Sequence, residues 1–218
     1  MGILLIESSS RKIEFGYAVD SEIVLNEELD VSHNADTLTY FIKKSFQKKN
    51  IKFDDIEIIS LSNGPGSFTG LRIGSAISKG ICFALGSKLI EVSTLDIIAN
   101  KLKTEVKIVS LVFSNPRTLE FYFCEYTFEL GKLKKLSDYK IGLLENILSD
   151  NSIHVINESL NENFPEEFKH KLKDVSQYSN VPSQFELTTD MTLKNEFSNY
   201  TTSKPFYLKE FIPKIGPQ

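Results

Sequence analysis

The chain has 218 residues, a hydrophobic content of 41% with 16 Phe and 8 Tyr, and a net charge of −4. This length suits two small domains or one large one, and the apolar content is sufficient for a real core. The mild acidity argues against an extended basic surface for nucleic acid. With only two cysteines, Cys82 and Cys124, a disulfide framework is excluded, and we expect both thiols to be buried.

The chain begins with segments that are typical of strands. Residues 2–6 are apolar and predict a buried strand, and residues 13–19 and 22–30 follow after short polar turns. We therefore expect a three-stranded meander. No basic region followed by a long apolar stretch occurs near the start, which argues against a secretion signal and predicts a cytoplasmic protein without a membrane anchor.

Helices and further strands alternate over residues 34–102. Residues 34–49 predict an amphipathic helix with a lysine-rich end. Residues 56–61 and 89–92 predict strands, and Ser93 or Thr94 can cap a helix that reaches about Leu102. The apolar stripe of the first helix consists of Ala35, Leu38, Phe41, Ile42, Ser45 and Phe46. This order of elements favours a mixed sheet that carries helices.

The densest turn signal, Asn63-Gly-Pro-Gly66, precedes a helix that we expect to end near Leu85. Small residues recur at every fourth position of this helix, as Gly70, Gly74 and Ser78 and as Ala76, Gly80 and Ala84, beside the row Ile73, Ile77, Ile81 and Leu85. A glycine inside a helix costs about 0.5–1 kcal/mol relative to alanine. Close approach to another helix or to a ligand would explain that cost, and packing on the chain's own sheet explains it equally well.

The second half of the chain gives weaker signals. Residues 106–113 and 120–128 are strongly strand-like, and we place a domain boundary between residues 103 and 104. Beyond Gly131 the sequence predicts a helix near 140–149, a strand at 153–156 and a helix at 188–200. Val181-Pro182 and Lys204-Pro205 indicate turns, and residues 206–212 form a short apolar segment.

Few residues suggest catalytic chemistry. His33, His154 and His170 are far apart, and none has metal-ligand spacing to another His, Cys or carboxylate. The glycine-rich turn lacks the Gly-Lys-Ser/Thr ending of a P-loop, although its N–H groups can hold an anion. Glu7, followed by Ser8, Ser9 and Ser10, can hold a magnesium-bound phosphate or can simply form a polar turn.

A long string, Gly64-Pro-Gly-Ser-Phe-Thr-Gly-Leu-Arg-Ile-Gly74, resembles the signature of the TsaB family, formerly called YeaZ. Other family landmarks follow in the same order over nearly the whole chain. They are Ile3-Leu-Leu-Ile-Glu-Ser-Ser9, Glu91-Val-Ser-Thr-Leu95, Arg117 with Glu120-Phe-Tyr122, and Pro205-Phe-Tyr-Leu-Lys209.

The resemblance implies an α/β protein with the actin-like, hexokinase-like ATPase fold, which contains a ribonuclease-H-like motif. It implies an N-terminal actin-like subdomain over residues 1–103 and a C-terminal subdomain over 104–218, each with a mixed sheet and flanking helices. Proteins of this family help to form threonylcarbamoyladenosine beside the tRNA anticodon. Their paralogue TsaD performs the transfer and carries the metal, and the ATPase TsaE joins them.

Three departures from the family pattern argue against catalysis by this chain. Glu7 stands where an Asp is usual, and Ser114 replaces the Asp of an Asp-Ala-Arg hairpin, with Asn115 and Pro116 inserted before Arg117. The paired-histidine metal motif of TsaD is absent. Each change removes a group that phosphoryl or metal chemistry would use.

We therefore expect a non-catalytic partner subunit with no cofactor or metal of its own, ATP and metal belonging to TsaD and TsaE. It would bind TsaD as a heterodimer, meet tRNA only within the complex, and form a homodimer through the same helices when alone. The expected interface residues are Leu38, Phe41, Ile42, Ser45, Gly70, Ile73, Gly74, Ile77, Ser78 and Ile81. A vestigial nucleotide site would comprise Glu7, Ser8, Ser9, Gly64 and Gly66. The alternative is an ATP-binding transferase or hydrolase, or a glycoprotease-like peptidase, that acts by itself.

Overall fold

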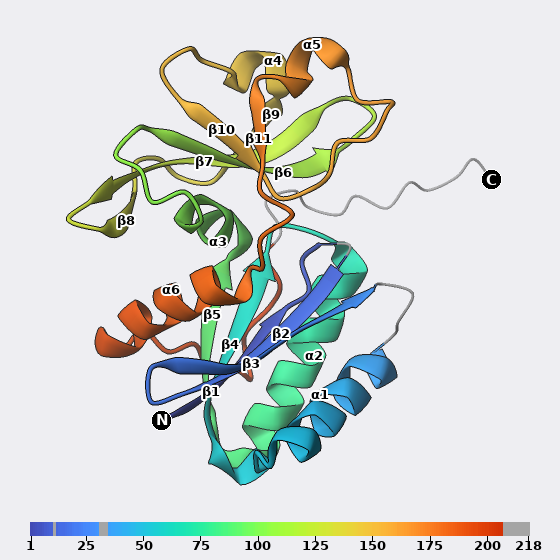
Figure 1. Ribbon diagram of the computed structural model, residues 1–218, viewed down its shortest axis with the longest axis vertical. Helices are drawn as coiled ribbons and strands as arrows, with labels where there is room; N and C mark the ends of the chain where they lie inside the picture. Colours follow the sequence, from blue (N-terminus) through green and yellow to red (C-terminus); the bar gives the residue numbers. More distant parts are fainter. Residues whose placement is uncertain (11, 31–34, 207–218) are drawn as a thin grey trace.

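The computed structural model describes residues 1–10, 12–30 and 35–206, which form two sheets (Figure 1). The first sheet has the strand order β3-β2-β1-β4-β5. β1 pairs antiparallel with β2, and β2 with β3, whereas β1, β4 and β5 run parallel. The strands are β1 (Gly2–Glu7), β2 (Lys12–Val19), β3 (Glu22–Asp30), β4 (Ile56–Gly64) and β5 (Lys88–Ser93). The predicted meander and mixed sheet are confirmed.

Helices cover both faces of the first sheet (Figure 1). Because side chains alternate along a strand, Leu4 and Ile6 of β1 join the core beneath α1 (Ala35–Lys49) and α2 (Phe68–Leu85). Ile3 and Leu5 face the opposite way, into a core that α3 (Thr94–Asn100) and α6 (Val181–Leu193) complete. A 3-10 turn, η1 (Phe53–Asp55), leads into β4.

The second sheet has the order β11-β10-β6-β7-β8, with β9 also paired to β7. α3 packs on one face, while α4 (Leu144–Ile147) and α5 (Glu166–Lys169) lie over the other. The strands are β6 (Ile108–Asn115), β7 (Glu120–Glu129), β8 (Lys132–Lys135), β9 (Lys140–Leu143), β10 (Ile153–Ile156) and β11 (Leu172–Asp174). α3 thus serves both cores and joins the two halves.

Two predicted helices were misplaced. In the region 140–149, residues 140–143 instead form β9, because they pair with the exposed edge of β7, and only Leu144–Ile147 are helical. The last helix is Val181–Leu193 rather than 188–200. Pro182 lies in its first turn, where the missing N–H is not needed, so it starts the helix instead of marking a turn. The predicted tail segment 206–212 lies outside the described residues except for Phe206.

The chain returns to the first sheet at its end. α6 packs on that sheet, Ser198 bridges to Leu89 of β5, and the Phe206 N–H donates to the Asn63 carbonyl at 2.8 Å. The division at residues 103 and 104 stays a prediction, to which the structure adds that residues 181–206 cover the first sheet. Within the described ranges, no helix is long and apolar enough to cross a membrane.

Candidate functional site

Two buried carboxylates lie at the end of β1. The β1–β2 register places Glu7 opposite Glu14, and the two residues are only 1% and 4% exposed. Glu7 Oε1 accepts hydrogen bonds from the Ser9 N–H, at 2.8 Å, and from the Ser9 hydroxyl. Burial, followed by the neighbouring Glu14 charge, raises the pKa of Glu7 above its usual value.

Asn180, at the start of α6, connects these two carboxylates. Its Nδ2 donates to Glu14 Oε1 at 2.6 Å and to Glu7 Oε2 at 3.2 Å. The Asn180 N–H and the Ser179 hydroxyl both donate to Glu14 Oε2, at 2.8 and 2.5 Å. All four carboxylate oxygens therefore accept hydrogen bonds from the chain itself. A neutral amide occupies the position between the carboxylates, so these residues do not fit a magnesium-bound phosphate.

Of the predicted nucleotide-site residues, Ser9 lies directly against Gly66, whereas Gly64 lies beside Leu71 and Phe206. The Ser67 N–H donates to the Ser9 carbonyl at 2.6 Å, so one N–H of the candidate phosphate cradle is already used. A Cβ at Gly66 would lie 2.2 Å from the Ser9 carbonyl oxygen, and one at Gly70 would lie 1.9 Å from that of Ser8. Glycine is needed here because the glycine turn packs directly against the β1–β2 turn.

Lys101 holds the segment that connects β11 to α6. Its Nζ donates to Asn157 Oδ1 at 2.7 Å and to the carbonyls of Tyr178 and Val175, at 2.6 and 3.3 Å. Burial lowers the pKa of Lys101 to about 8, although the charge of Glu14 opposes this shift. Lys101 therefore holds the carbonyls of Val175 and Tyr178 in the connecting segment. Glu14 holds the hydrogen-bond donors of Ser179 and Asn180 at the end of the same segment.

A polar cleft of about 510 Å³ lies between the two halves beside this segment. Its lining residues come from the β1–β2 hairpin and from the carboxyl ends of β10 and β11, and they include Lys12, Glu14, Asn157, Glu158, Asp174 and Asn180. Among its described lining residues, three carboxylates face one lysine, which is a poor match for a polyphosphate. Within the described ranges, no group of three or more His, Cys, Asp or Glu side chains is placed to hold a metal.

Sequence reasoning missed Glu14, Lys101 and Asn180. Glu14 could have been found, since a tight β1–β2 hairpin brings it opposite Glu7. Asn180 precedes Val-Pro, and an Asn before a proline-containing first turn is a helix-start signal that was interpreted as a turn. Lys101 gave no local signal, because its partners are 56 to 77 residues away in the sequence.

Five of the predicted interface residues face the chain's own sheet or the β1–β2 turn. Leu38 and Ile42 are buried in the core of the first sheet. Gly74 and Ser78 are also buried, and a Cβ at Gly74 would lie 2.2 Å from Ser8 Oγ. Gly70 likewise faces the β1–β2 turn. This correction has a simple cause: an apolar or small-residue stripe has the same spacing whether it faces its own sheet or another subunit.

The other predicted residues border a surface that we call the α1–α2 face. It consists of the half-buried Phe41, Ser45, Ile73, Ile77 and Ile81 and the exposed Ala76, Gly80, Phe83 and Ala84. Phe83 is 79% exposed, and a Cβ at Gly80 would meet nothing within 4 Å. The outward series of small residues, rather than the Gly70 series, therefore leaves the backbone of α2 open to close approach.

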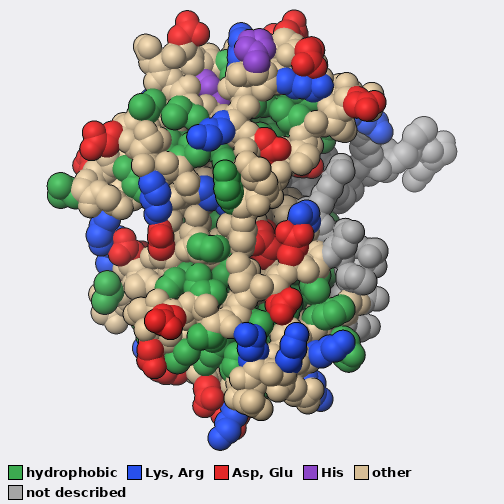
Figure 2. All heavy atoms as spheres, viewed as in Figure 1, with side chains coloured by type: hydrophobic (Ala, Val, Ile, Leu, Met, Phe, Trp, Pro, Cys, Tyr) green, Lys and Arg blue, Asp and Glu red, His purple; other side chains and the backbone are tan. Residues whose placement is uncertain are grey.

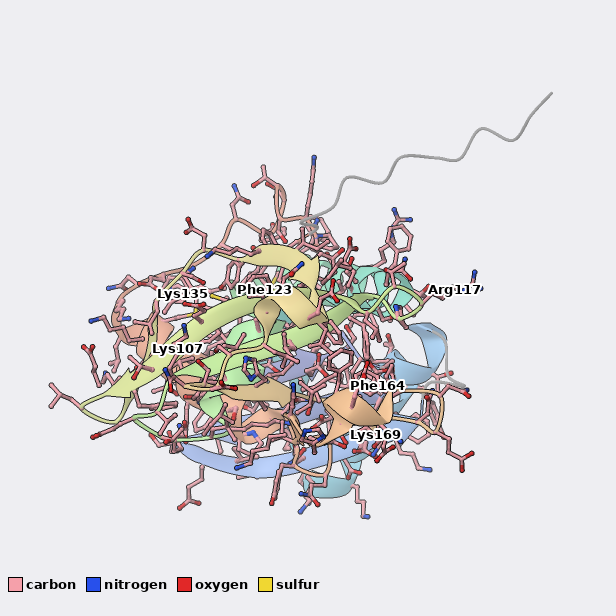
Figure 3. All side chains as sticks on the ribbon, turned by 90° about the horizontal axis from the view of Figure 1, so that it is seen from above. Lys107, Arg117, Phe123, Lys135, Phe164 and Lys169 are labelled. Carbon is pink, nitrogen blue, oxygen red and sulfur yellow. The ribbon has the colours of Figure 1, made fainter. Side chains whose placement is uncertain are left out.

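Within the described part of the chain, the β6–β7 turn and the histidines show no catalytic arrangement. Ser114 donates to Glu120 Oε2 at 2.8 Å, which closes the turn on itself. Arg117 is exposed and extends away from the sheet (Figure 3). His154 is buried beside the Ile147 carbonyl, and burial lowers its pKa. His33 lies outside the described residues.

Comparison with known proteins places this arrangement in a family. The model of the family "TsaD: tRNA N6-adenosine threonylcarbamoyltransferase" matches residues 27–210. The tRNA threonylcarbamoyladenosine biosynthesis protein TsaB of Buchnera aphidicola is 28% identical over 56% of this chain and 54% of its own length. The tRNA N6-adenosine threonylcarbamoyltransferase of Bacillus thuringiensis is 33% identical over 45% of this chain and 30% of its own length.

The fold has a close counterpart among solved structures. YeaZ from Pseudomonas aeruginosa superposes with a TM-score of 0.78 at 16% identity, covering 95% of this chain and 99% of the other. The sequence matches span about half of the TsaB relative and less than a third of the transferase, whereas the family model and the fold extend over nearly the whole chain. The chain therefore belongs to the family of TsaD, tRNA N6-adenosine threonylcarbamoyltransferase, whose model matches most of its length.

Proposed function

We propose that this protein is a partner subunit of a TsaD-type transferase, required to form threonylcarbamoyladenosine in tRNA, and that it does not perform the transfer itself. It would act in the cytoplasm, bind TsaD as a heterodimer and work with TsaE, which together would supply the ATP and metal chemistry. The observation that carries this proposal is the α1–α2 face. There an open glycine and a protruding aromatic ring lie on one helix beside a half-buried isoleucine row.

The packing of this face favours a helical partner. Ala76, Gly80 and Ala84 recur once per turn, so another helix could approach the backbone of α2 closely. Phe83 would supply a large apolar anchor of the kind that dominates binding energy at interfaces. An actin-like subunit that carries the same pair of helices would present a similar face, so the same surface would also form a homodimer when TsaD is absent.

The Glu7–Glu14 pair supports a role without catalysis. A phosphate with its magnesium would need free carboxylate oxygens, and the oxygens of this pair already accept hydrogen bonds from Ser9, Ser179 and Asn180. Releasing them would require α6 to separate from β2, since Asn180 lies at the start of that helix.

The test mixes the purified protein with TsaD from the same genome and measures the complex by gel filtration and calorimetry. We expect a heterodimer, and we expect Phe83→Asp to weaken it at least tenfold. Leu193→Asp is the matched control, because Leu193 is 75% exposed on α6, on the opposite side of the sheet. Failure of the two folded proteins to associate at micromolar concentration would refute the proposal.

The same preparation tests the rival activity. Isolated protein titrated with ATP and magnesium should give no heat of binding and no turnover. Tight nucleotide binding that is lost in Glu7→Gln would favour an enzyme acting by itself.

A further inference from the structure

The outer side of α1 is unusually basic for a protein of net charge −4. Residues 37–53 contain five lysines and no Asp or Glu. Tyr40, Lys43, Lys44 and Lys48 are all exposed, and we call them the lysine stripe. Figure 2 shows the blue Lys and Arg side chains gathered over α1, at the lower right of that view.

Ordinary structural roles do not account for the whole stripe. Lys48 and Lys49 lie in the last turn of α1, where cations stabilise the helix dipole, but Lys43 and Lys44 lie further inside the helix. Lys49 lines a cavity with four acidic residues, Asp20, Asp54, Asp55 and Glu57, so we leave it out of the stripe. Among the residues that the structure describes, no carboxylate forms an ion pair with Lys43, Lys44 or Lys48.

Two exposed lysines of β8 differ in this respect. Lys132 pairs with Asp190 at 3.0 Å, and Lys134 pairs with Glu129 at 2.8 Å. Among the described side chains, therefore, no carboxylate pairs with the positive charge of the stripe, which is the electrostatic condition for binding a polyanion.

An aromatic ring stands within the stripe. Tyr40 is 58% exposed, and Lys44 Nζ lies 5.8 Å from its ring centroid. Cations that follow a backbone beside a ring on which a base can stack are typical of surfaces that bind unpaired nucleic acid. A single helix with three lysines can neutralise at most about three phosphates, so the contact would be weak and strongly salt-dependent.

We propose that Tyr40, Lys43, Lys44 and Lys48 form a contact surface for the backbone and an unpaired base of RNA. The inference rests on the proposed function in taking tRNA as the RNA, and it goes further by giving this chain a direct contact with the substrate. The stripe lies on α1, beside the α1–α2 face, so RNA and a protein partner could be bound together.

The test measures fluorescence anisotropy of a labelled RNA stem-loop with the full-length protein, alone and mixed with TsaD. Lys43→Glu with Lys44→Glu should weaken binding at least tenfold in dilute salt. It should also lower the slope of log K against log salt by about 1.4 to 1.8, which corresponds to two phosphates. Tyr40→Ala should weaken binding of the stem-loop and leave binding of a fully paired duplex unchanged.

The matched control is Lys132→Glu with Lys134→Glu, two exposed lysines on β8 that carry the same change of charge. Equal weakening by this control would overturn the inference, because net charge alone would then explain binding. If polyglutamate displaced the labelled RNA as effectively as unlabelled RNA does, the inference would also be overturned, and the stripe would be assigned to an acidic protein partner. Absence of RNA binding by both the free and the mixed protein would do the same.

The proposed function and this inference can fail separately. If the heterodimer forms but substitutions in the lysine stripe leave RNA affinity unchanged, the inference fails and the proposed function stands. If RNA binding depends on the stripe and no heterodimer forms, the inference stands and the proposed function fails. Thermal unfolding of each variant establishes that surface charge, and not folding, has been changed.

Discussion

The glycines of α2 offer a direct test of which side of this helix is packed. In Gly70→Ala, the new Cβ would lie 1.9 Å from the Ser8 carbonyl oxygen, where ordinary carbon–oxygen contacts exceed about 3.3 Å. The obstacle is backbone in a turn fixed by hydrogen bonds, so it cannot rotate away as a side chain could. In Gly80→Ala, the Cβ would meet nothing within 4 Å.

The two changes should therefore have opposite signs. Overpacking of this kind costs about 1–3 kcal/mol, and a first-turn residue gains little helix propensity in return, so Gly70→Ala should lower the melting temperature by about 2–12 °C. Gly80→Ala should raise it by about 2–4 °C, since alanine is favoured over glycine by about 1 kcal/mol inside a helix. Gly74→Ala should fall between them, because its nearest neighbour is the Ser8 hydroxyl.

Thermal unfolding followed by circular dichroism at a fixed protein concentration measures this order. In the partner-binding assay, we expect the effect at Gly80: Gly80→Leu should weaken the heterodimer and leave the fold intact. If Gly70→Ala were as stable as Gly80→Ala, the packing of the glycine turn against the β1–β2 turn would be refuted.

Three further predictions concern buried polar groups. Burial lowers the pKa of Lys101 to about 8 in the folded protein, whereas a lysine in the unfolded chain has a pKa of about 10.4. As the pH rises, the folded protein therefore loses the Lys101 proton before the unfolded chain does. The stability of the wild type relative to Lys101→Met should therefore rise between about pH 8 and pH 10 in denaturant titrations, and a constant difference would contradict this. Burial raises the pKa of Glu7, so the wild type should lose stability relative to Glu7→Gln as pH rises above about 4.3, and the opposite trend would show that the pKa of Glu7 is not raised. Tyr126→Phe removes the hydroxyl that donates to Asp96 Oδ1 at 2.6 Å and should cost about 1.5–3 kcal/mol in chemical unfolding, whereas Tyr178→Phe, at an exposed ring, should be neutral.

Sequence patterns predicted the elements whose periodicity is set locally. Residues 153–156 were expected as a strand and form β10, and the stripe of α1 was expected from its helical spacing. β9 was not predicted, because four residues pair as a strand only when the edge of β7 is available to them.

The candidate site was less predictable, because its contacts join distant parts of the chain. Asn180 reaches Glu14 across 166 residues, and no local pattern encodes that contact. The direction of Ile42 and Gly74 could not be read from spacing either, since a core face and an interface face share one period.

The return of the chain to the first sheet has a consequence for how the protein is made. One face of that sheet, with Ile3, Leu5 and Ile58, is covered by α6, whose first residue is Val181. When residue 103 has been synthesised, about 80 further residues must follow before this cover exists, which at about 5–20 residues per second takes roughly 4–16 s. During that interval an apolar sheet face is open to solvent and to chaperones, and a fragment ending at residue 103 would keep it open permanently.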